Sequence, residues 1–151
     1  MQLHHYIGLL RRAERNLADA FRQVADAHSA EPDVEGMCKR LAEQCERHDR
    51  GLEPFTERFG EDSGDEPDRL HSDLFEGTRE GPLALLRDLH DLYLMANECD
   101  ITWTLVGQAA RAIRDEELVA TVESCEGETT IQLAWLRTRS KAAAPQTLVV
   151  T

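Results

Sequence analysis

The sequence predicts an all-α fold, a bundle of four long helices. Four stretches carry apolar residues three or four positions apart, which is the spacing of one helix face. Clusters of proline, glycine and acidic residues separate these stretches, and no run alternates polar and apolar residues as a half-buried strand would. A chain of 151 residues can bury one well-developed core. We therefore expect a single bundle over residues 1–141, followed by an apolar tail over residues 142–151.

The balance of charge excludes two classes of partner. The chain has 29 Asp plus Glu against 17 Lys plus Arg, which gives a formal net charge of −12. Such an excess repels phosphate backbones and anionic lipid headgroups. No stretch is apolar for the roughly 18 residues that a membrane span needs. We expect neither a nucleic acid nor a membrane as partner.

The first half of the chain predicts a helical hairpin. The first helix is expected from Leu3 to about Ser29, and the second from Asp33 to Phe59. Pro32 separates them because proline is disfavoured inside a helix. The inward residues expected on the first helix are Tyr6, Leu10, Glu14, Leu17, Phe21 and Val24, and those on the second are Cys38, Leu41, Cys45, His48, Leu52 and Phe55.

The segment after the second helix is too long for a tight turn. An acidic, Gly- and Pro-rich loop over residues 60–67 leads to a short amphipathic piece with Leu70, Leu74 and Phe75. Neighbouring antiparallel helices are usually joined by only a few residues. We therefore expect one long crossover that runs the length of the bundle, so that the second and third helices are parallel.

The second half predicts another hairpin. Pro82 suits the first turn of a third helix, and Asp115 is expected to cap the fourth. Arg137, Arg139 and Lys141 would lie in its last turn, where cations suit the helix dipole. The expected inward residues are Leu85, Leu89, Leu92, Ala96, Cys99, Trp103, Val106, Ala110 and Ile113 on the third helix, and Leu118, Val122, Cys125, Thr129, Leu133 and Leu136 on the fourth.

Surplus apolar residues predict self-association. Tyr93 and Leu94 lie outside the stripe of the third helix, Trp135 lies near the end of the fourth, and the tail carries Leu148 followed by two valines. Contiguous apolar patches on a surface usually mark contact sites. We expect a homo-oligomer, most simply a homodimer.

Two polar residues interrupt the apolar seams at the middle of their helices. Glu14 and His48 stand where a soluble helix normally places an aliphatic side chain, because a buried charge is costly unless it is paired or binds a metal. Polar or thiol groups fall at similar depth on the other two helices. The candidate metal ligands are Glu14, Cys45, His48, Asp100, Cys125 and Glu128.

This layout from Leu3 to Lys141 resembles the ferritin-like superfamily, in which two helical hairpins are joined by one crossover. The di-iron members place a Glu on each of two helices and a Glu-x-x-His on each of the others. Glu14 and His48 match this pattern, whereas Cys45 and Cys125 stand in place of a Glu and Glu128 in place of a His. The resemblance implies iron- or oxygen-linked redox chemistry, and a thiolate ligand shifts the metal preference towards zinc or a mononuclear site.

Other interpretations stay open from the sequence alone. Glu14 paired with His48 or an arginine would be a satisfied core pair in a metal-free bundle that serves as an interaction module. A pocket between the helices would instead bind a small molecule. A protein without any cofactor is as compatible with the sequence as one with iron or zinc. The four cysteines form no Cys-x-x-Cys pair and the start shows no signal peptide, which predicts buried free thiols in the cytoplasm.

Overall fold

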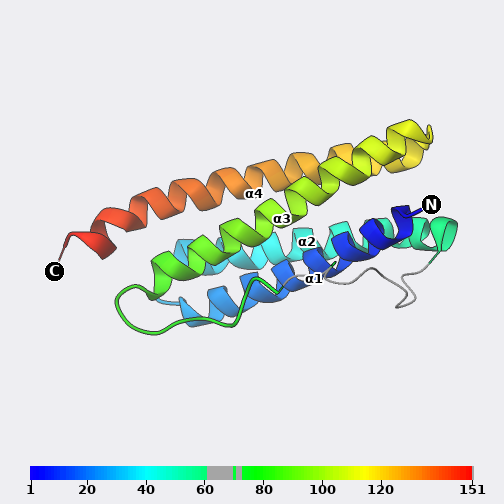
Figure 1. Cartoon of the computed structure of the whole chain (residues 1–151). Helices are drawn as coiled ribbons and strands as arrows, with labels where there is room; N and C mark the ends of the chain where they lie inside the picture. Colours follow the sequence, from blue (N-terminus) through cyan, green and yellow to red (C-terminus); the bar gives the residue numbers. More distant parts are fainter. Residues whose placement is uncertain (61–69, 71–72, 151) are drawn as a thin grey trace.

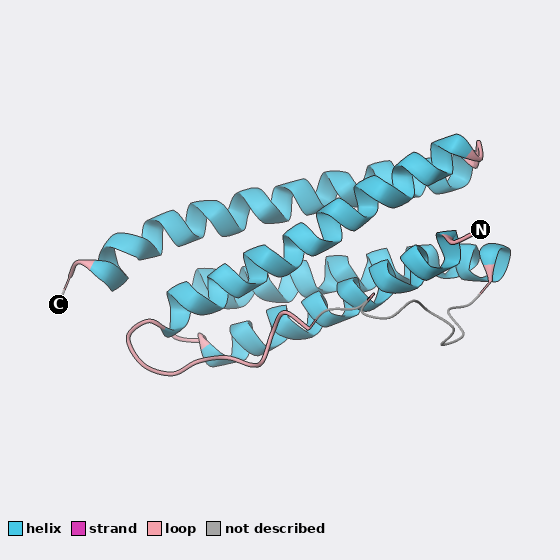
Figure 2. Cartoon of the chain, viewed as in Figure 1, coloured by secondary structure: helices cyan, strands magenta, loops and turns pink. Residues whose placement is uncertain are grey.

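The computed structural model describes residues 1–60, 70 and 73–150 of the chain. These residues form the helices α1 (Leu3–Ala27), α2 (Pro32–Phe59), α3 (Ala84–Ala112) and α4 (Glu116–Leu148), and they contain no strand (Figures 1 and 2). The predicted all-α four-helix bundle is confirmed. Across these same ranges, no helix is long and apolar enough to cross a membrane.

Two hairpins make the bundle. α1 packs against α2, α3 packs against α4, and the hairpins meet through contacts of α1 with α3 and of α2 with α4. In Figure 1, α2 and α3 run in the same direction, whereas α1 and α4 run in the opposite one. Every pair of helices in contact is therefore antiparallel, and the middles of all four helices meet in one core.

The apolar seams pack largely as the sequence predicts. Leu10, Leu17, Phe21 and Val24 of α1 are fully buried, and the predicted seams of α2 and α3 supply most of the remaining core. Tyr6 is an exception, because it is exposed and Ile7 takes the inward position instead. Ile113 is also exposed, since it is the C-cap residue that follows the last turn of α3.

A buried carboxylate ties the segment before α3 to the bundle. Asp88 is 0% exposed, and its carboxylate accepts hydrogen bonds from the backbone N–H and guanidinium of Arg79. His28, just after α1, lies 2.8 Å from the same carboxylate. Phe75 packs against the core as predicted, whereas Leu74 is exposed. Asp88 thus links His28, which follows α1, to Arg79, which precedes α3.

The fourth helix begins where predicted and ends later. The side chain of Asp115 accepts a hydrogen bond from the backbone N–H of Leu118, which is an N-cap. α4 then continues past Lys141 and through Pro145 to Leu148. Three consecutive alanines, the strongest helix formers, carry it beyond the cationic residues from which we predicted its end.

Substitution of two glycines can test how closely α3 and α4 pack against each other. A Cβ atom on Gly107 would lie 2.9 Å from Cγ1 of Val122, whereas a Cβ atom on the exposed Gly127 would meet nothing within 4 Å. Gly127→Ala should stabilise the fold by up to about 1 kcal/mol through helix propensity. Gly107→Ala should destabilise it by about 1–2 kcal/mol, because overpacking exceeds that gain. Urea unfolding measures both, and equal stabilisation by the two changes would contradict a tight contact at Gly107.

Candidate functional site

The interior polar site centres on Glu14, which is 1% exposed in the middle of α1. Its Oε1 atom accepts a hydrogen bond of 2.8 Å from the indole Nε1–H of Trp103 on α3. The same oxygen lies 3.2 Å from Nδ1 of His48 on α2, and His48 is 2% exposed. The prediction that Glu14 and His48 interrupt the seams of neighbouring helices and meet in the core is therefore confirmed.

His48 is held from both sides. Its Nε2 atom lies 2.9 Å from Oε1 of Glu128 on α4, opposite the contact with Glu14. The edge of its ring meets Trp103, with ring centroids 5.9 Å apart and planes at 89°. Glu128 is partly exposed, and its second oxygen lies 3.7 Å from the guanidinium of Arg47. A continuous line of polar contacts thus leads from the centre of the bundle to its surface.

The two carboxylates decide the charge of His48. Burial lowers the pKa of an imidazole, but the hydrogen bonds and charges of Glu14 and Glu128 outweigh burial and raise the His48 pKa above its usual value of 6.5. The protonated ring has two N–H donors. When protonated, it donates to Glu14 through Nδ1 and to Glu128 through Nε2, so that the charged ring bonds one oxygen of each carboxylate.

Three cysteines surround the same carboxylate. Cys45 of α2, Cys99 of α3 and Cys125 of α4 are buried free thiols. Burial is the main cause that raises the pKa of each, and repulsion from the Glu14 charge adds to all three. For Cys125 the pKa reaches about 12. Each helix therefore contributes at least one carboxylate, imidazole or thiol to one central region.

One atom of this region is unsatisfied. Oε2 of Glu14 is buried and has no hydrogen-bond partner among the residues that the structure describes. A buried carboxylate oxygen without a donor is costly. Each such atom in a folded protein calls for an explanation, and an ion that the coordinates do not hold is one of them.

The structure does not bring all six predicted ligands together. Asp100 lies half-buried on α3, and its pKa is raised by burial and then by repulsion from Glu126 of α4. Thr104 bonds both the backbone carbonyl of Asp100 and the Glu126 carboxylate. Asp100 thus belongs to an outer contact between α3 and α4, whereas its neighbour Cys99 faces the core.

Sequence reasoning missed three members of the centre. Cys99 and Trp103 were assigned to apolar packing because they lie in the α3 stripe. Gln132 is 1% exposed, and its amide donates to Gln44 and approaches the sulfur of Cys45. The signal for Gln132 was its spacing of seven residues from Cys125, which puts both on the inner face of α4.

The candidate metal ligands lie near one another, but they do not form a complete coordination site. Among residues 1–60, 70 and 73–150, no three His, Cys, Asp or Glu side chains are spaced so that they could hold a metal ion as they stand. The Glu14–His48–Glu128 contacts instead satisfy the imidazole directly. Metal binding would therefore require side chains of the centre to rotate and thiols to lose protons.

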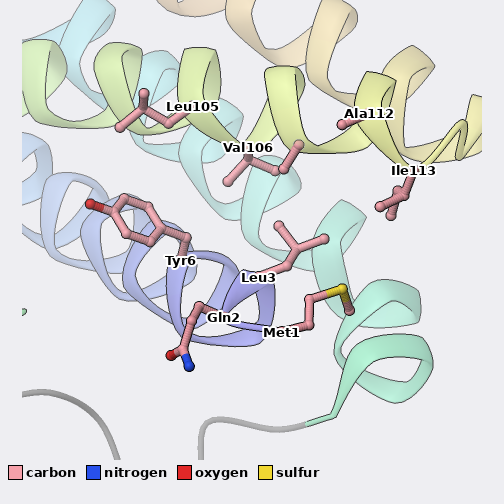
Figure 3. A pocket seen from close by; sticks show the side chains of 9 residues that line it. Met1, Gln2, Leu3, Tyr6, Leu105, Val106, Ala112 and Ile113 are labelled. Atoms are coloured by element: carbon pink, nitrogen blue, oxygen red, sulfur yellow. The ribbon is translucent and has the colours of Figure 1, made fainter.

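A large hollow lies away from this centre. The N-terminus of α1 and the last turns of α3 line a pocket of about 480 Å³. Figure 3 shows the side chains that line it. Its walls are apolar, and only Gln2 and Tyr6 offer side-chain hydrogen-bonding groups; the lining residues are Met1, Gln2, Leu3, Tyr6, Leu105, Val106, Ala109, Ala112 and Ile113. None of its lining side chains is a carboxylate, imidazole or thiol, so this pocket has none of the candidate metal ligands that gather in the core.

Comparison of the chain with protein-family models, with curated proteins and with solved structures found no match.

The buried contacts predict a strong dependence on both partners. Glu14→Ala should cost about 3–5 kcal/mol, because it leaves the imidazolium and Trp103 without their acceptor. The double change Glu14→Leu with His48→Leu should cost less than the sum of the two single changes, since it removes both charges. Urea unfolding of the four proteins completes the cycle, and additive effects would contradict the coupling.

The pH dependence of stability has a predictable sign. Unfolded His48 titrates near 6.5 and folded His48 above that value. Its contribution is therefore complete below pH 6.5 and is lost as the pH rises through the folded pKa. A second decline should begin near pH 9, where unfolded thiols ionise while folded Cys38 and Cys125 stay protonated up to about 12.

The control for this titration is His48→Gln. Its free energy of unfolding should lack the first decline and keep the second, because the cysteines are unchanged. Unfolding by urea at closely spaced pH values measures both curves. Parallel curves for the two proteins between pH 6.5 and 9 would contradict a raised His48 pKa.

Proposed function

We propose that the chain is a ferritin-like protein that binds a single transition metal, zinc or iron, in the core of its bundle. The directions of the helices support the ferritin-like topology, because α2 and α3 run in the same direction, as they do in a bundle in which one crossover joins two helical hairpins. The packing of α1 on α3 and of α2 on α4 agrees with that topology.

The observation that carries the metal proposal is the unsatisfied Oε2 of Glu14. A cation at this atom would compensate a buried negative charge that otherwise has donors on one oxygen only. Cys45, Cys99 and Cys125 approach from the three other helices, and all three interact with Glu14 electrostatically. Glu14 is therefore the natural first ligand, with thiols as the others.

The donor set favours some metals over others. Thiolates select zinc or iron over magnesium and calcium, which prefer oxygen ligands. The absence of an intact Glu-x-x-His motif in this sequence disfavours a carboxylate-bridged di-iron centre. Zinc would act as a structural staple between helices, whereas iron would supply one-electron redox chemistry. Glu128 and His48 lie between the proposed metal site and the surface, where they would take up or release protons.

An interaction module is the second candidate, and the outer face of α3 supports it. Leu94, Ile101 and Leu105 are exposed, and their spacing of seven and four residues puts them on one side of the helix. Such a stripe is the usual seam between packed helices. In this alternative the Glu14–His48–Glu128 contacts serve only the stability of a metal-free homo-oligomer.

Metal analysis separates the two candidates. The chain purified without a histidine tag should take up one equivalent of zinc, with release of protons, because the thiols are protonated beforehand. Elemental analysis after gel filtration gives the stoichiometry, and a pH-sensitive dye gives the protons. Cys45→Ser and Glu14→Gln should each reduce the bound zinc by at least tenfold at limiting metal.

Cys38→Ser is the matched control. Cys38 is also a buried thiol on α2 with a raised pKa, but its pKa is shifted by burial and Asp33 and not by Glu14. Its replacement should leave zinc binding unchanged. Equal loss in the Cys38 and Cys45 variants, or no stoichiometric zinc or ferrous iron in the unaltered chain, would overturn the metal proposal and leave the interaction module.

A further inference from the structure

A second hollow lies between the start of α3 and the end of α4, remote from the polar core. It has a volume of about 370 Å³, within the usual range for small-molecule pockets. Side chains of both helices line it, and on each helix they fall within positions three or four residues apart or next to one another, as on one helix face. They are Leu86, His90 and Tyr93 on α3, and Arg137, Ser140, Lys141 and Ala144 on α4.

The two cations of this groove have no carboxylate partner among the described residues, whereas several other arginines of the chain do. Arg139, on the other side of α4, pairs with Glu31 and Asp33, and Arg58 pairs with Asp115 and Glu117. In the described ranges, Arg137 and Lys141 make no ion pair with any carboxylate. Two uncompensated cations beside one groove create a positive site on a chain whose net charge is −12.

Hydrogen-bond donors gather at the same place. Arg137 donates to the hydroxyl oxygen of Tyr93 at 3.3 Å, and its guanidinium lies 5.6 Å from the centre of the ring. Arg87 lies 2.7 Å from Nδ1 of His90. Because arginine only donates, Nδ1 accepts, and the ring proton is on Nε2. Arg137, Lys141, His90 and Ser140 thus each carry a hydrogen-bond donor and line the same groove.

The walls between these donors are apolar. Leu86 and Ala144 line the groove, and the aromatic ring of Tyr93 lies beside the guanidinium of Arg137. A fully hydrated inorganic anion would gain nothing from these walls, whereas a short hydrocarbon chain would be shielded from water. A guanidinium also binds a carboxylate through two parallel hydrogen bonds.

We infer that this groove is a binding site for an amphipathic carboxylate, with the carboxylate at Arg137 and Lys141 and the apolar body along Leu86, Tyr93 and Ala144. The site is separate from the proposed metal centre, since it uses the opposite half of α3 and the end of α4. A medium-chain fatty acid such as octanoate has the required chemistry and a size that suits the volume.

The test is titration of the full chain with sodium octanoate, followed by amide chemical shifts in NMR spectra. Shifts should be confined to residues around His90, Tyr93 and Ala144. Arg137→Gln and Lys141→Gln should each weaken binding by about tenfold or more, because each removes a charged hydrogen bond. Arg50→Gln removes the same charge from an exposed arginine of α2 and should leave the affinity unchanged.

Three further probes separate the ligand chemistries. Octan-1-ol has the chain without the charge, acetate has the charge without the chain, and inorganic phosphate has a different charged group. Each should bind at least tenfold more weakly than octanoate. No octanoate binding, equal binding of acetate or phosphate, or equal losses in the Arg50 and Arg137 variants would overturn the inference.

Discussion

The buried charge of Glu14 is the constraint on which the rest of the core depends. A carboxylate that is 1% exposed destabilises a fold unless donors reach it from neighbouring elements. Those donors come from α2 through His48 and from α3 through Trp103. Because α1 lies between these two helices, one side chain fixes the depth at which each of them packs against α1. Aliphatic seams alone would tolerate a slip by one turn, whereas these hydrogen bonds would not.

His48 extends this constraint to the fourth helix. Its second nitrogen contacts Glu128, so α4 is placed relative to α2 by a polar contact where few other contacts join them. The charges alternate along the line Glu14, His48, Glu128 and Arg47, which keeps each charge beside its opposite. Only the outer end reaches water. The centre therefore combines a buried, hydrogen-bonded interior with a solvent-exposed end, at Glu128, that can gain or lose a proton.

The sequence predicted the helices and the burial of Glu14 and His48, because both follow from spacing within one helix. It did not predict Trp103 as a partner of Glu14, and it grouped Glu128 with His48 only as candidate metal ligands, since the relative depth of two helices depends on packing between them. Asp100 shows the same limit: it lies at mid-helix depth in the sequence, but its side chain faces the outer contact with α4, next to the inward-facing Cys99. The late end of α4 reflects helix propensity overriding the charge signal at Arg137, Arg139 and Lys141. Tyr6 and Ile7 are adjacent on a helix whose first turn offers either to the core, and packing chooses the aliphatic one.

The shared hydrogen bonds of Glu14 also constrain how this protein can diverge. Replacing His48, Trp103 or Glu14 alone leaves a buried donor or acceptor unsatisfied, whereas replacing them together restores a uniform apolar core. Single substitutions at positions 14, 48 and 103 should therefore be rare among descendants of this sequence, and the three positions should change as a set. Positions such as Leu17 or Leu52, whose contacts are apolar, carry no such linkage and are free to exchange with other aliphatic residues one at a time. The polar centre is thus an evolutionary unit that spans three helices, although its members are 34 to 89 residues apart in the chain.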